Sequence, residues 1–414
     1  MPPLAIVGAR LLDARSERSL AGDVLLVGED GLITRVGSAA RSRFPDGAPV
    51  IDAEGRTLVP GLIDCHVHLS ATHELLHDTV RRSYTEWTAV MLAAGRSILE
   101  CGVTTARDGG FTPAGFRRIF ERREYPGPRL QVSVMPLSIT GGHGDGMTPS
   151  GIDLNDGLPH WELPSGIADG PDQVRHVVRQ QIAAGADWIK VMATGGVYSV
   201  LDSPDAVQYT VDEMRVMVEE AENAGIRGVM AHCENARGIK HALRAGIRSI
   251  EHGDGLDDEG IDLMLERGVP LVPTFLAIEE MLREDRVTSG ATPPWAVEKV
   301  RVLVAGQGPV FRHAIERGVR IAMGTDLGGG THLPAELSLM VENGLSPLGA
   351  IRAATIDAAR LLGLDDRIGT LEPGKVADVL LVDGDPLDEP GIWRDPARIQ
   401  LVVQGGRIVA DRRS

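Results

Sequence analysis

The sequence predicts an α/β fold in which a (β/α)₈ barrel is flanked by a small β unit made from both ends of the chain. Three observations predict it. A loose repeat, in which a helical segment ends at a glycine and a short apolar strand follows, runs through residues 60–368. Segments of β type occupy both ends, 1–59 and 369–414. Histidine, lysine or aspartate stands at the end of several apolar strands.

The two ends of the chain resemble each other in their pattern. Both contain short apolar runs and turns, without a helical period. The runs are 4–12, 23–27, 31–36 and 50–52 in the first part, and 379–382, 399–404 and 408–410 in the second. Gly405-Gly406 is a hairpin turn signal between the last two runs. We expect 1–59 and 369–414 to form one composite domain, with two unrelated flanking sheets as the alternative.

Glycines divide the middle of the chain into helices and strands. Glycine adopts the left-handed conformation that ends a helix at low cost. The glycines at such junctions are Gly102, Gly185, Gly225, Gly246, Gly268 and Gly318. The expected strands are 62–68, 103–107, 130–135, 188–192, 228–232, 249–252, 270–272 and 320–323. Eight buried strands with intervening helices match a (β/α)₈ barrel, and an open doubly wound sheet is the alternative.

Composition excludes several classes of protein. The chain has 414 residues, of which 43% are hydrophobic, as in a large globular barrel protein. No apolar run approaches the roughly 18–20 residues of a membrane span, and no secretory signal is visible. Three scattered cysteines suit a reducing compartment. The net charge of −16 disfavours nucleic acid and anionic membranes as partners, although it also serves solubility. We expect a cytoplasmic homo-oligomer that acts on a small molecule.

Two histidines close the first expected strand. His66 and His68 are two residues apart, so their side chains share one face of the strand. Two buried imidazoles are costly unless their nitrogens find partners. A divalent cation would satisfy them, because neutral imidazole is a common metal ligand. Hydrogen-bonded core histidines are the alternative.

Further candidate ligands stand at other strand ends. They are Lys190 on the fourth expected strand, His232 on the fifth, His252 on the sixth and Asp326 after the eighth. In a barrel, the carboxyl ends of all strands converge on one mouth. Each residue alone is compatible with a satisfied core group or a snorkelling side chain. Six such residues at strand ends favour one shared site.

Lys190 indicates a particular chemistry. A protonated ammonium would repel nearby cations, but burial lowers the pKa of a lysine and favours the neutral amine. A neutral amine can take up carbon dioxide and become a carbamate, a carboxylate equivalent that can bridge two metals. Two cations with a bridging hydroxide perform two-metal hydrolysis.

At these residues the chain resembles the amidohydrolase superfamily. The resemblance covers essentially the whole chain, and segments 59–64 and 374–378 also look like the flanks of that family. It implies a deformed barrel over 60–368 and a β-sandwich made from both termini. It implies two divalent metal ions, with zinc expected. His66, His68 and Asp326 would hold one and His232 and His252 the other, with carbamylated Lys190 bridging and Asp326 also accepting the proton of the attacking hydroxide.

Two loops are similar to those of the imidazolonepropionase-related dipeptidases, the Xaa-Pro and Xaa-Arg or Xaa-Lys kind. They are 140–145 and 193–197. Imidazolonepropionases and aromatic deaminases usually carry one metal and lack the strand-four lysine, so Lys190 favours the binuclear amide hydrolases. We expect His143 to hold the scissile carbonyl or a substrate carboxylate, and Tyr198 to cap a carboxylate or oxyanion. Purely structural roles for both residues are the alternative.

The sequence therefore predicts metal-dependent hydrolysis of an amide bond in a dipeptide or N-acyl amino acid by a metal-bridging hydroxide. The alternatives are a deaminase or cyclic-amide (imidazolone) hydrolase, a lactonase or carbamate hydrolase, and an inactive scaffold. Glu234 departs from the small residue expected after the strand-five histidine; altered specificity and simple exposure to solvent are the two alternatives for it. Segments 151–169 and 275–292 are expected to line the mouth, where selectivity usually lies.

Overall fold

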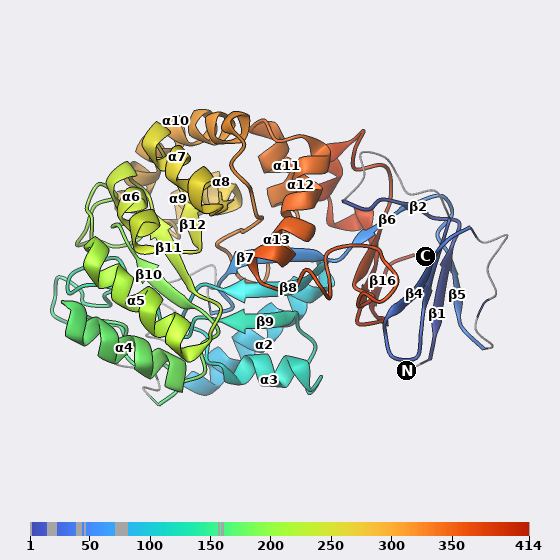
Figure 1. The fold of residues 1–414 in the computed structure, drawn as a ribbon, viewed down its shortest axis with the longest axis horizontal. Coiled ribbons are helices and arrows are strands. Elements are labelled where there is room, and N and C mark those ends of the chain that lie inside the picture. The colour runs from blue at the N-terminus through green and yellow to red at the C-terminus, as the bar shows by residue number, and fades with distance from the viewer. Residues whose placement is uncertain are drawn as a thin grey trace.

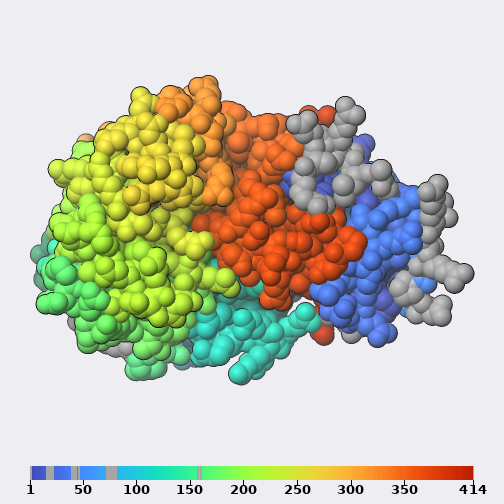
Figure 2. All heavy atoms as spheres, in the orientation of Figure 1, coloured from blue at the N-terminus to red at the C-terminus, as the bar shows by residue number. Residues whose placement is uncertain are grey.

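The computed structural model describes residues 2–14, 23–38, 44, 47–70, 82–155, 158 and 161–413. Figure 1 shows a part with parallel strands and helices beside a smaller β part, where both chain ends lie. In Figure 2 the orange surface of the C-terminal region lies between the yellow-green helical part and the blue N-terminal strands. The α/β class is confirmed.

The central strands form two parallel sheets. The first, in the order β7-β8-β9, contains β7 (Leu62–Val67), β8 (Val103–Asp108) and β9 (Arg129–Val132). The second, in the order β10-β11-β12-β13, contains β10 (Ile189–Met192), β11 (Val229–Cys233), β12 (Ser249–His252) and β13 (Leu271–Val272). These strands are almost entirely buried, as strands covered on both faces must be.

The eighth expected strand, 320–323, is wrong as a strand. Only Ile321 forms a parallel bridge, to Leu271. The next residues turn to different partners: Met323 N donates to Ala353 O at 2.9 Å, and Met323 O accepts from Cys65 N at 2.8 Å. A second bridge pairs Val191 on β10 with Leu137, which follows β9 in the chain. Within the described ranges the central strands thus form two sheets, and no sheet runs continuously round a barrel.

Helices alternate with these strands. They are α2 (Tyr84–Glu100), α3 (Gly115–Glu121), α4 (Pro171–Ala183), α5 (Val211–Ala224), α6 (Ala236–Ala245), α7 (Asp258–Arg267), α8 (Phe275–Met281), α9 (Glu284–Ser289), α10 (Pro294–Arg317), α11 (Ala335–Glu342), α12 (Pro347–Ala353) and α13 (Ile356–Leu361). Left-handed glycines end α5, α6, α7 and α10, at Gly225, Gly246, Gly268 and Gly318, as predicted. None of the helices in the described part is long and apolar enough to cross a membrane.

Strands from both chain ends share the smaller part. One sheet has the order β4-β3-β1-β5, with β1 (Leu4–Val7), β3 (Val24–Val27), β4 (Ile33–Gly37) and β5 (Val50–Asp52). The other has the order β16-β15-β14-β6-β2, with β2 (Arg10–Leu11), β6 (Thr57–Pro60), β14 (Val379–Val382), β15 (Ile399–Gln404) and β16 (Arg407–Asp411). Two 3₁₀ helices, η2 (Pro390–Arg394) and η3 (Pro396–Arg398), precede β15.

One apolar cluster joins both sheets of this part. It includes Ile6 and Leu25 from the first sheet and Leu381 and Leu401 from the second. Strand β6 pairs antiparallel with β14, with Leu58 opposite Leu381. The domain boundaries 1–59, 60–368 and 369–414 stay a prediction.

Asp378 provides a test of how the two parts are joined. Its carboxylate is 5% exposed and accepts from Arg129 Nη1 on β9 at 2.8 Å and from Gly405 N at 2.7 Å. Asp378→Ala should destabilise the protein by about 2–4 kcal/mol, because it leaves a backbone N–H and a partly buried guanidinium without their acceptor. Chemical unfolding measures this, with the exposed Asp366→Ala as the control. Equal unfolding midpoints for the two variants would contradict the role of Asp378 in joining the two parts.

Candidate active site

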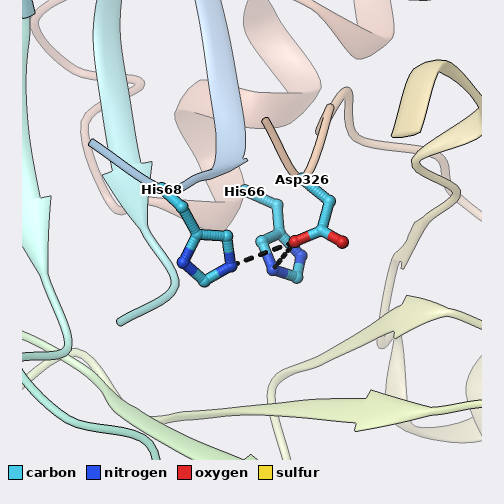
Figure 3. Close-up of side chains that lie close together, drawn as sticks. All are labelled: His66, His68 and Asp326. Carbon is cyan, nitrogen blue, oxygen red and sulfur yellow. Dashed lines mark ion pairs between the residues drawn. The ribbon is translucent and has the colours of Figure 1, made fainter. Parts of the chain in front are cut away.

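Three of the predicted ligands form a compact group. His66 lies at the end of β7, His68 just beyond it, and Asp326 follows the segment that pairs through Ile321. Asp326 Oδ1 lies 3.2 Å from His66 Nε2 and 3.0 Å from His68 Nε2. Figure 3 shows both rings directed toward this carboxylate. Ligand atoms of all three residues lie within 4.8 Å of one another, a spacing that could hold a metal ion.

The other predicted residues adjoin this group. Lys190 Nζ lies 3.1 Å from His66 Nε2. The ring centroids of His66 and His252 are 5.2 Å apart, and those of His252 and His232 are 4.5 Å apart. Strand register brings His232 and His252 close together. Met192 on β10 pairs with His232 on β11, and the next residue of β11, Cys233, pairs with His252 on β12. Their roles as ligands stay a prediction.

Each of the four histidines has one ring nitrogen engaged by a neighbour, and its other nitrogen is left for the site. The pairs are His66 Nδ1 with Glu251 Oε2 at 3.0 Å, His68 Nδ1 with Gly110 O at 3.2 Å, His232 Nε2 with Gly195 O at 3.1 Å and His252 Nδ1 with Thr274 Oγ1 at 2.8 Å. Such outer partners set the tautomer and orient the ring of a metal ligand. The donor set therefore fits a divalent cation.

The electrostatics of the donors also suit a cation. Burial lowers the pKa of His232 well below its usual value and that of His252 to about 3, so both rings are neutral near pH 7. Burial likewise lowers the pKa of Lys190. Although burial opposes ionisation of Asp326, His66 and His68 hold the pKa of this carboxyl well below its ordinary value. Metal ligands must be deprotonated to bind.

A buried ion pair behind His66 was not predicted from the sequence. Glu251 and Arg107 are both fully buried, and Arg107 Nη2 donates to Glu251 Oε1 at 2.9 Å. Arg107 Nε also donates to Cys65 O at 2.6 Å, directly before His66. Despite burial, Arg107 and His66 hold the pKa of Glu251 at about 2. The sequence offered one signal for this ion pair, because a charged residue stands within each of the apolar strands β8 and β12.

Three residues of the candidate site have a strained backbone conformation. His252, Thr274 and Asp326 have φ values of 69°, 54° and 57°, in the left-handed region that non-glycine residues seldom adopt. Such conformations persist only where the surrounding structure enforces them, and they concentrate at functional sites.

His143 and Tyr198 line the cavity over this group. The ring of His143 stacks on that of His232 with centroids 4.5 Å apart, and its Nδ1 lies 2.9 Å from Ser199 Oγ. Gly196 permits this position, because a Cβ there would lie 2.3 Å from His143 Cε1. Tyr198 lines the cavity beside Lys190 and His143.

A larger cavity of about 330 Å³ opens beside the site and is mostly apolar. Both segments expected at the mouth contribute to its wall, through Leu154 and Leu158 from the first and Ala277 and Met281 from the second. Residues 156–157 and 159–160 of the first segment lie outside the described residues.

Known proteins resemble this chain in sequence and in fold. The model of the amidohydrolase family matches residues 57–409. Ochratoxinase from Aspergillus niger is 35% identical over 369 residues, covering 85% of this chain and 75% of that protein. Imidazolonepropionase from Rhizobium rhizogenes is 28% identical, covering 91% of this chain and 90% of that protein. The crystal structure of a Xaa-Pro dipeptidase with methionine bound in its active site matches with a TM-score of 0.87 and 30% identity, over 98% of this chain and 99% of that one.

Glu251 allows a test of the outer partners. Glu251→Gln should weaken metal binding about 10–100-fold, because the amide no longer holds the His66 tautomer as a carboxylate does. Competition with a chromogenic chelator measures the affinity. Glu220→Gln is the matched control, since Glu220 is also buried and paired with arginines, but on the helices α4 and α5, through Arg175 and Arg179. Unchanged affinity in the Glu251 variant would refute the role.

Proposed function

Because this chain belongs to the amidohydrolase family, as its motifs indicated, we propose that it is a binuclear metal hydrolase that cleaves the amide bond of a dipeptide or N-acyl amino acid. The observation that carries the proposal is the set of four oriented histidines, with Lys190 and Asp326, at one mouth. Similarity to a Xaa-Pro dipeptidase and to imidazolonepropionase supports this branch of the family.

In this proposal His66, His68 and Asp326 would hold one ion, His232 and His252 would hold the second, and zinc is the expected metal. Lys190, as a carbamate, would be a ligand shared by both ions. Its neutral amine nitrogen bonds to the carbon of carbon dioxide and one proton is released, so the side chain gains one negative charge. When bound, the metal ions supply Lewis acidity and activate water.

The remaining side chains handle protons and orientation. Asp326 accepts the proton of the attacking water and returns one to the amine nitrogen as the C–N bond breaks. His143 directs Nε2 at the scissile carbonyl or the substrate carboxylate, because Ser199 occupies Nδ1. The Tyr198 phenol donates to a carboxylate or oxyanion. We also propose that the two parallel sheets are arcs of one (β/α)₈ barrel, beside a β-sandwich of 1–59 and 369–414.

The first test concerns the substrate carboxylate. Blocking it as an amide or ester should lower kcat/KM by about 10²-fold or more, the ~1.5–3 kcal/mol of a charge-assisted hydrogen bond. Steady-state rates of zinc-loaded enzyme on matched free and blocked dipeptides measure the effect. Equal turnover would point instead to neutral amides, carbamates or lactones, and ammonia release from heterocycles would support a deaminase.

The second test concerns Lys190. Lys190→Ala should lose the second metal and most activity, because His232 and His252 alone hold an ion weakly. Short carboxylic acids should partly restore both by occupying the bridging position. Lys190→Arg should not be restored, since a guanidinium stays cationic and is not carbamylated.

Metal analysis of the variants and the intact mass of the metal-loaded wild type measure these outcomes. Reconstitution of the apo-enzyme should also be faster with added bicarbonate. An unmodified Lys190 in fully active enzyme would defeat the proposal, as would an alanine variant with two metals and full rate.

A further inference from the structure

Two buried carboxylates beside the site have no assigned role. Glu234 follows β11 and Asp254 follows β12, and they are 7% and 8% exposed. Within the described structure, Glu234 Oε2 and Asp254 Oδ1 are buried and have no hydrogen-bond partner. Such atoms are costly to bury and rare in native proteins, so each calls for an explanation.

Both carboxylates line one small cavity. Its volume is about 90 Å³, and His232, His252 and Asp326 also line it. The unpartnered oxygens therefore lie beside the predicted metal ligands, in a compartment with room for a small polar group.

Neighbouring donor groups of the protein have other partners. Lys299 Nζ donates to the carbonyl oxygens of Gly196, Ser199 and Asp202 at 3.1, 2.7 and 2.8 Å. His232 Nε2 lies 3.6 Å from Glu234 Oε1 but contacts Gly195 O at 3.1 Å. The compartment thus presents two carboxylates to whatever enters it, which favours a cationic hydrogen-bond donor.

This small compartment adjoins the larger apolar cavity. His68, His143, Tyr198 and Asp326 line both. Farther out, the wall of the larger cavity includes Trp87, Phe111, Met147, Leu154 and Met281. A molecule attacked near Asp326 can therefore place one end among carboxylates and the other among apolar side chains.

We propose that Glu234 and Asp254 bind the N-terminal α-ammonium of a dipeptide whose second residue is apolar, an inference that rests on the proposed function. In a dipeptide the ammonium nitrogen is only two bonds from the scissile carbonyl carbon, so it must sit beside the attacked atom. An ammonium supplies three donors for oxygens that lack them. An N-acyl amino acid brings no cation to this position and leaves both carboxylates unpaired. Glu234 and Asp254 therefore select the free dipeptide from the two substrate classes.

A matched substrate pair tests this inference. L-Alanyl-L-phenylalanine and propionyl-L-phenylalanine differ only in the α-ammonium. The zinc-loaded wild type should prefer the dipeptide by about 10²-fold in kcat/KM, as expected for a charge-assisted hydrogen bond. Glu234→Gln and Asp254→Asn should each reduce this preference about tenfold or more, keep activity on propionyl-L-phenylalanine and keep the metal content. Glu279→Gln, which alters an exposed carboxylate paired with Arg394, should change neither ratio nor metal.

The possible outcomes distinguish failure of the ammonium-binding inference from failure of the proposed amide hydrolysis. Equal rates on both substrates in the wild type, a measurement that needs no variant, would overturn the inference and leave amide hydrolysis intact. Loss of metal in either variant with an unchanged substrate ratio would also overturn it, because the carboxylates would then be metal ligands. Hydrolysis of neither substrate, nor of any other dipeptide or N-acyl amino acid, would overturn the proposed function itself and this inference with it.

Discussion

The site depends on one constraint: a buried imidazole must have both ring nitrogens satisfied. Four histidines meet at the carboxyl ends of the strands, and each has one nitrogen held by an outer partner. The partners differ in kind, from the Glu251 carboxylate to backbone carbonyls, but each is fixed by its own strand or loop. The neutral imidazoles of His232 and His252, an ionised Asp326 and a lysine whose pKa is lowered by burial together form a donor set that a protein core would otherwise avoid.

The fold positions this set through strand register and buried charge. Strand pairing sets His232 on β11 opposite Met192 on β10 and Glu251 on β12, and it sets His252 opposite Cys233. Arg107 on β8 reaches across to Glu251 on β12 and also holds the carbonyl before His66. A change to this ion pair would therefore be transmitted to His66. The left-handed backbone at His252 and Asp326 is a further cost of this arrangement.

The sequence was informative where a local pattern sets the structure. Gly225, Gly246, Gly268 and Gly318 end helices as predicted, and seven of the eight expected strands exist. Segment 320–323 failed because an apolar run does not reveal that its backbone bonds are divided among Leu271, Cys65 and Ala353, so that only Ile321 forms a bridge. The ion pair between Arg107 and Glu251 could not be predicted, because the two residues are distant in the chain and come together only in the folded structure. Glu234 stood out as unusual, but its relation to Asp254 appears only once β11 and β12 are side by side.

The central claim is that two metal ions occupy this mouth. Anomalous diffraction at the zinc absorption edge, on crystals of protein purified without chelator, tests it most directly. The account predicts two peaks, one between His66, His68 and Asp326 and one between His232 and His252, with continuous density from Lys190 reaching both. A single peak, or density for an unmodified Lys190 in active protein, would contradict it.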